Sequence, residues 1–199
     1  SRANPEYTVV DRAGETRQWG VLCYGYPEVR QHYRGRIRHY TEGYDWDGVF
    51  LCLRTQARPA AFADQFGFNE PVREAMRDRC GVDILREDFD LGAWREVQGE
   101  FFTTFLRELR ADLKPRGIAI SVGVQRGDVI GPPIGNWPIQ WRTWAEEGLI
   151  DALVVDQNSS QCPSMWHGLW PMHRGYGYLQ NPLNDLNLPP IEPMLRDDY

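Results

Sequence analysis

The sequence predicts an α/β domain built from parallel βα units, and three features of the 199-residue chain point to that class. Apolar runs at residues 118–124 and 149–155 have almost no polar alternation, which suits strands buried on both faces. Amphipathic segments with helical periodicity separate such runs. Each run ends in charged or amide residues, and ligand chemistry in parallel α/β folds gathers at the carboxyl ends of strands.

Composition narrows the classes of function. The net charge of −6 and the isoelectric point near 5.3 lack the basic excess of a nucleic-acid-binding protein. No stretch approaches the unbroken apolar length that crosses a bilayer, so no membrane span is expected. The four cysteines are widely separated, with no C-x-x-C pair and no histidine at ligand spacing. We therefore expect neither a metal ion nor a cofactor.

The first half of the chain alternates strand and helix signals. A strand is expected at residues 18–25, where a Gly-Tyr-Pro turn closes it. Pro27 then opens a helix with apolar residues at spacings of three and four, leaving an Arg-rich face in solvent. The second strand is expected at residues 47–53 and ends at Arg54. Strand, helix and strand in this order predict a βαβ unit.

Two helices follow a long loop. Residues 57–68 lack a period and are expected to lie over the carboxyl end of the second strand. Asn69 is a suitable N-cap for a helix that Gly81 ends. Residues 88–116 carry the longest helical pattern, which Pro115 terminates.

The last two strands, at residues 118–124 and 149–155, flank a Gly- and Pro-rich loop and a short helix. We assign residues 1–158 to a βα-repeat region and residues 159–199 to an irregular, aromatic- and Pro-rich segment of the same domain. Four strands are half of an eight-stranded (β/α)₈ barrel, which typically needs about 250 residues. The chain is thus expected to form a small open sheet, to pair with another copy, or to belong to a longer protein.

Three segments carry a resemblance to a known family. PEVRQHYRGRIRHYTEGYDWDGVFL (residues 27–51), FADQFGFNEPV (62–72) and FLRELRADLKPRGIAISVGV (105–124) resemble bacterial glycosyl-hydrolase-like TIM-barrel proteins. The resemblance spans roughly residues 25–158. It implies a partial or truncated (β/α)₈ TIM-barrel-like domain that acts on glycosidic bonds, in an exported or envelope-associated protein, with the site at strand carboxyl ends.

Candidate catalytic residues are acids at these ends. Most glycoside hydrolysis needs two carboxyl groups about 5 to 9.5 Å apart, one as acid and one as nucleophile or base. Asp128 and Asp156 follow consecutive predicted strands, and Glu70 starts a helix beneath the loop. We assign Asp156 as nucleophile or base and Asp128 or Glu70 as acid. The alternatives are an Asp128–Arg126 ion pair and, for Glu70, alignment with the helix dipole.

A carbohydrate ligand needs hydroxyl-binding and ring-stacking side chains, because sugars have flat apolar faces and polar edges. The expected hydroxyl-binding residues are Arg54, Arg126, Gln157 and Asn158. The expected stacking residues are Trp137, Trp166, Trp170 and Tyr176.

The sequence departs from the family pattern at one strand. Where such families commonly have acidic residues after the strand start, this chain has Cys52, Leu53 and Arg54. The lost carboxylate keeps a second interpretation open, in which the protein binds carbohydrate or acts as a scaffold without cleaving it. A third is a half-barrel that needs assembly to complete its fold.

Overall fold

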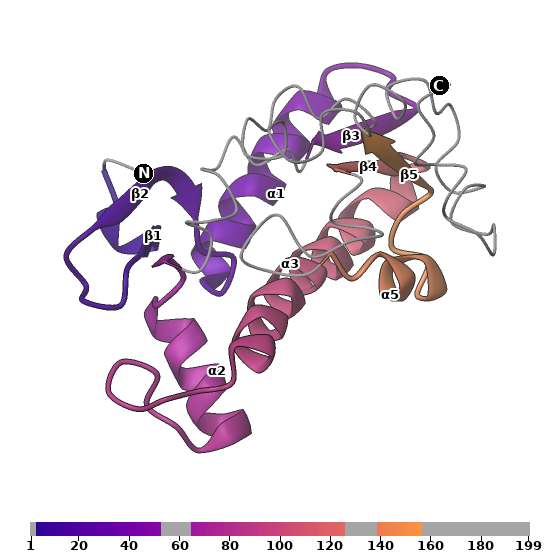
Figure 1. Cartoon of the computed structure of the whole chain (residues 1–199). Helices are drawn as coiled ribbons and strands as arrows, with labels where there is room; N and C mark the ends of the chain where they lie inside the picture. Colours follow the sequence, from indigo (N-terminus) through magenta and orange to yellow (C-terminus); the bar gives the residue numbers. More distant parts are fainter. Residues whose placement is uncertain (1–2, 53–64, 126–138, 157–199) are drawn as a thin grey trace, which may run out of the picture.

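The computed structural model describes residues 3–52, 65–125 and 139–156 (Figure 1). The described chain contains both helices and strands. In order they are η1 (Pro5–Tyr7), β1 (Thr8–Val10), β2 (Arg17–Leu22), α1 (Pro27–Glu42), β3 (Gly48–Cys52), α2 (Glu70–Cys80), α3 (Leu91–Leu113), η3 (Lys114–Arg116), β4 (Ala119–Gln125), α5 (Trp141–Glu146) and β5 (Ala152–Asp156).

A three-stranded parallel sheet with the order β3-β4-β5 confirms the predicted α/β class. Neighbours in this sheet are also consecutive strands in the chain. Helices α2 and α3 lie in the connection from β3 to β4, and α5 lies in the connection from β4 to β5. Parallel neighbours need such crossovers because the chain must return to the starting edge of the sheet.

Helices cover only one face of this sheet in the described part of the chain, whereas the apolar runs predicted burial on both faces. Ile120, Val122 and Val124 are fully buried against apolar residues of α3 and α5. On the opposite face, Phe50 is 57% exposed and Val154 is 48% exposed. Successive side chains of a strand point to opposite faces, so each strand divides its apolar residues between a packed and an open side.

The first predicted strand does not join the parallel sheet. β2 instead pairs antiparallel with β1 in a separate two-stranded sheet. The turn between them is closed by the backbone N–H of Asp11, which donates to Thr16 O at 2.9 Å, and by Glu15 N–H, which donates to Asp11 Oδ1 at 2.9 Å. A short connection favours antiparallel pairing, and the strand pattern alone did not reveal β1 as the partner.

The helix ends agree with the sequence signals. Asn69 occupies the N-cap position of α2, and Gly81 ends the helix with φ of 72°, a left-handed conformation that glycine adopts without steric cost. α3 starts after Asp90, whose side chain accepts a hydrogen bond from Ala93 N–H at 3.0 Å. Pro115 lies in η3 directly after α3. Gly81 and Pro115 therefore mark the ends of α2 and α3 as predicted.

Two hydrophobic clusters share the long helix α3. Its first turns, with Trp94 and Val97, pack on the β1–β2 hairpin and α2. Its later turns, with Phe105 and Leu109, pack on the parallel sheet. Figure 1 shows α3 extending from α2 to the sheet. Among the helices described here, none is long and apolar enough to span a membrane.

Candidate functional site

The carboxyl edge of the parallel sheet is where the predicted catalytic acids should gather. β3, β4 and β5 end at Cys52, Gln125 and Asp156. Asp156 is the last residue of β5, and its backbone lies in register with Gln125 of β4. β4 extends two residues beyond Gly123, the partner of Cys52. Asp156 therefore lies at the carboxyl end of β5, and its catalytic role stays a prediction.

Most of the other predicted site residues lie outside the described residues. They are Arg54, Arg126, Asp128, Trp137, Gln157, Asn158, Trp166, Trp170 and Tyr176. Their roles as acid, hydroxyl-binding or stacking groups stay predictions.

Glu70 is the one predicted acid whose side chain is described. It is the first residue of α2, and its carboxylate is half-exposed and forms an ion pair with Arg73 one turn later. With Asp11, Arg17 and Tyr26 it lines a hollow of about 250 Å³ between the hairpin and the start of α2. No described residue of the parallel sheet lines this hollow. A carboxylate at a helix start is stabilised by the helix dipole, and this position of Glu70 fits that interpretation.

Asn69, beside this hollow, has a role that the sequence did not indicate. Its side chain is buried and does not cap α2. Instead, Asn69 Oδ1 accepts from Val10 N–H at 3.3 Å, and its Nδ2 donates to Thr8 O at 3.0 Å and to Glu6 O at 3.2 Å. The side-chain amide bonds to the backbone of the hairpin because buried backbone groups need hydrogen-bond partners. It thereby fixes β1 against α2.

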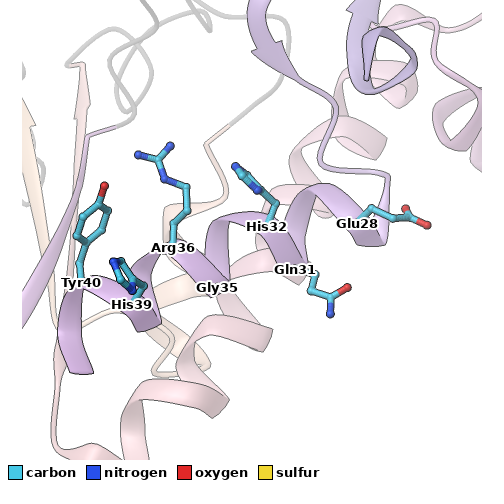
Figure 2. Close-up of a pocket in the computed structure, with 7 residues that line it drawn as sticks. All are labelled: Glu28, Gln31, His32, Gly35, Arg36, His39 and Tyr40. Carbon is cyan, nitrogen blue, oxygen red and sulfur yellow. The ribbon is translucent and has the colours of Figure 1, made fainter. Parts of the chain in front are cut away.

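A second hollow, of about 470 Å³, runs along the outward surface of α1 (Figure 2). We call it the α1 hollow. Its lining residues are exposed and come from one helix: Glu28, Gln31, His32, Gly35, Arg36, His39 and Tyr40. Figure 2 shows His32, Arg36 and Tyr40 projecting to the same side, as residues four apart on a helix do. Apolar periodicity correctly places Val29, Tyr33 and Ile37 on the packed face of α1. The same spacing would add Tyr40 to that face, but Tyr40 is 60% exposed and lines the hollow.

The arginines of α1 divide between two environments. Arg34 Nε donates to Asp112 Oδ2 on α3 at 2.7 Å, and this hydrogen bond lowers the pKa of the Asp112 carboxyl. Arg30 Nε likewise donates to Glu108 Oε1 at 3.0 Å. Arg36 faces the α1 hollow, and its guanidinium lies 5.9 Å from the centre of the Tyr40 ring. Two of these arginines therefore hold α1 on α3, while Arg36 is presented to solvent.

Metal and thiol chemistry find little support in the described ranges. No group of three or more His, Cys, Asp or Glu side chains there could hold a metal ion. Cys23 is buried, and burial raises the pKa of its thiol to about 11, so the nucleophilic thiolate is disfavoured at neutral pH. Cys52 is exposed at the end of β3, where its side chain faces the uncovered side of the sheet.

Comparison with known proteins assigns no family. No protein-family model matches the chain, and no curated protein matches it. The function proposed below therefore follows from the residues, the geometry and the resemblance of the three segments described above.

Proposed function

We propose that the chain is a glycoside hydrolase, or part of one, in which Asp156 acts as nucleophile or base and Asp128 as the acid. The observation that carries this proposal is the parallel, in-register pairing of β4 and β5. This pairing puts the carboxyl ends of β4 and β5 at the same edge of the sheet. In the sequence, Asp156 is the last residue of β5, and Asp128 follows the end of β4 by three residues. Two carboxyl groups close together at such an edge are what glycosidic cleavage requires.

Chain connectivity limits how far apart the two acids lie. Paired strands are about 4.8 Å apart, so the backbone of Asp156 is that close to the backbone of Gln125. Asp128 follows Gln125 by three residues, which span at most about 11 Å. These limits allow the carboxyl separation of about 5 to 9.5 Å that retaining and inverting enzymes use. Asp128 is favoured over Glu70 as the acid because Arg73 pairs with Glu70.

The finer fold proposal is that β3, β4 and β5 are adjacent strands of a (β/α)₈ barrel. Two features support it: the strand order follows the chain, and the described helices cover only the face that would be outside a barrel. Phe50 and Val154 would then point into the barrel interior, which side chains from other strands fill. All-parallel sheets are almost always covered on both faces. The exposed apolar face is therefore expected to be covered by further strands of the barrel.

Substrate contacts in this proposal come from the predicted groups beyond the strand ends. Arginine and amide side chains would bind sugar hydroxyls, and aromatic rings would stack on sugar faces. The hydroxyl-binding set is Arg54, Arg126, Gln157 and Asn158, and the stacking set is Trp137, Trp166, Trp170 and Tyr176.

The test is turnover of a broad panel of oligosaccharides and polysaccharides, measured as new reducing ends. Asp156→Asn and Asp128→Asn are expected to lower kcat by about 10²–10⁴-fold, the usual contribution of such groups, while substrate binding persists. Asp78→Asn, an exposed acid on α2, is the matched control and should keep full activity. A wild-type chain that cleaves no glycan, or an Asp156→Asn variant with full turnover, would show that the proposal is wrong.

The second candidate is a carbohydrate-binding protein without catalysis, and the end of β3 favours it. The last residue of this strand is the exposed Cys52, where the resembling families commonly have an acid nearby. A thiol cannot serve as the carboxylate of the usual mechanism. Glycan binding without any turnover would select this candidate.

A further inference from the structure

The end of α1 and the turn into β3 expose three aromatic side chains, and we call residues 40–47 the α1–β3 corner. Tyr40 is 60% exposed, Tyr44 is 75% exposed and Trp46 is 52% exposed. Single exposed apolar residues are common, whereas a cluster of large rings on a surface marks an interaction site. Tyrosine and tryptophan are also among the residues most enriched at the energetic centres of protein interfaces.

Hydrogen bonds and ring contacts hold the corner in place. Trp46 Nε1 donates to Tyr40 O at 3.1 Å, which ties the indole to the last turns of α1. The rings of Tyr44 and Trp46 lie 5.9 Å apart at 67°, an edge-to-face arrangement. At the other end, Ala119 N–H of β4 donates to Asp47 O at 2.9 Å. Rings that are already positioned lose less conformational entropy when a partner binds.

Three carboxylates border these rings. Glu42, Asp45 and Asp47 are all exposed. None of the three forms an ion pair within the part of the chain that the structure describes. The sequence of the corner, YTEGYDWD, contains no Arg, Lys or His. The corner therefore combines an aromatic surface with an excess of negative charge.

Arginines beside the corner are already engaged with other groups. The Arg36 guanidinium lies 5.9 Å from the centre of the Tyr40 ring. Arg38 forms an ion pair at 3.8 Å with an acid on α3. The Arg116 guanidinium donates to Thr41 O at 2.7 Å and to Thr41 Oγ1 at 2.8 Å. The charge of the three carboxylates is thus left for a group outside the described residues.

A polypeptide segment that carries arginine or lysine matches both features of the corner. Guanidinium and ammonium groups stack on the faces of tryptophan and tyrosine rings, and they pair with carboxylates. A polyanion such as nucleic acid would meet the three acids, and an uncharged ligand would gain nothing from them. Neither hollow described above includes Tyr44 or Trp46, so these rings form an open surface, which suits an extended partner better than a small molecule.

This surface lies away from the edge where hydrolysis is proposed. Asp47 directly precedes Gly48, the first residue of β3, so the corner adjoins the amino edge of the sheet. The five residues of β3 rise about 13 Å toward the carboxyl edge. A partner on the corner therefore occupies a different place from a substrate at Asp156.

We propose that the α1–β3 corner binds a basic segment of a partner protein. Arginine or lysine side chains of that segment stack on Trp46 and Tyr44 and pair with Glu42 and Asp45. The surface is then a docking site that joins this chain to another protein. The inference rests on none of the residues that the hydrolase proposal uses.

The experiment starts from a phage library of random dodecapeptides, selected on the full chain and counter-selected on Trp46→Ala. Peptides that the wild type retains and the variant does not are expected to be richer in arginine and lysine than the unselected library. Calorimetric titration then measures the most enriched peptide. Trp46→Ala should weaken its binding about tenfold, the size of a lost cation–π contact, and Trp46→Phe, which keeps a ring, should lose less.

The charge of the corner is tested with the same peptide. Glu42→Gln combined with Asp45→Asn leaves all three rings in place and should weaken binding about two- to tenfold. Added salt should weaken binding to the wild type more than binding to this double variant, because salt screens exposed charges.

The control variants lie elsewhere on the surface. Leu91→Ala removes an exposed apolar side chain at the start of α3, and Asp78→Asn neutralises an exposed acid on α2. Both should bind the peptide as the wild type does. The proposal is wrong if no peptide depends on Trp46, if the peptides that do are not enriched in arginine and lysine, or if the double variant binds as tightly as the wild type. These measurements use no glycan, so their outcome is independent of the hydrolase test.

Discussion

Asp151 is expected to hold the register on which the proposed site depends. Its carboxylate accepts a hydrogen bond from the backbone N–H of Ile120 at 2.8 Å and a two-pronged bond from Arg110, with distances of 2.7 and 3.0 Å. Ile120 is fully buried in β4, so its N–H has no access to water. This bond starts the pairing of β4 and β5 that ends with Gln125 opposite Asp156.

Two substitutions at Asp151 separate these contributions. Asp151→Ala leaves a buried N–H unpaired, which costs about 1–3 kcal/mol, and loses a partly exposed ion pair worth about 1 kcal/mol or less. Asp151→Asn keeps an oxygen for Ile120 and loses only the charge. We therefore expect the free energy of unfolding to fall by about 1–4 kcal/mol for the alanine variant and by about 1 kcal/mol or less for the asparagine variant.

Urea unfolding followed by tryptophan fluorescence measures both changes. The hydrogen bonds from Arg110 lower the pKa of Asp151 below its ordinary value of 3.8. A group with a lowered folded pKa stabilises the protein above its unfolded pKa, and this contribution disappears as the pH falls through the folded pKa. The difference between wild type and Asp151→Asn should thus be full at pH 7 and shrink below about pH 4. Equal losses for Asp151→Ala and Asp151→Asn at pH 7 would refute the assigned role.

Three further substitutions test the packing around the hairpin and α1. Asn69→Ala should lower the free energy of unfolding by about 2–4 kcal/mol, because Val10 N–H loses its buried acceptor; an unchanged urea midpoint would contradict this. Gly25→Ala should cost about 1–3 kcal/mol, since a Cβ there would lie 2.7 Å from Pro71 Cβ, and an unaltered melting temperature would count against it. Gly35→Ala should raise stability by about 0.5–1 kcal/mol, because Gly35 is exposed within α1 with open space around it; a lower melting temperature would disagree.

Part of the candidate site could be predicted from local sequence. The apolar run of β5 stops at a charged residue, and this pattern alone predicts that Asp156 lies at a strand end. The α1 hollow was not predicted. Helical periodicity tells which face is packed, and the remaining face looks like ordinary solvated surface whether or not it binds a ligand. The start of α2 predicted an N-cap at Asn69 but not that its amide serves the hairpin.

The sequence by itself determined the elements that depend on neighbours in the chain. Proline, glycine and the spacing of apolar residues placed α1, α2 and α3, and the apolar runs placed β3, β4 and β5 to within about three residues. Each of these sequence signals involves residues within one or two helical turns or within a single strand. A short segment of the chain is therefore enough to predict the element.

The tertiary structure alone decided how those elements pair and which surfaces they leave open. β2 joined β1 rather than the parallel sheet, and the described helices that pack on that sheet lie on one of its faces, leaving Phe50 and Val154 exposed. Segments far apart in the chain compete to pair with a strand or to pack on a sheet face. The favoured arrangement depends on how much apolar surface it buries and how many backbone hydrogen bonds it forms. A pattern within one segment carries no information about these totals for the whole fold.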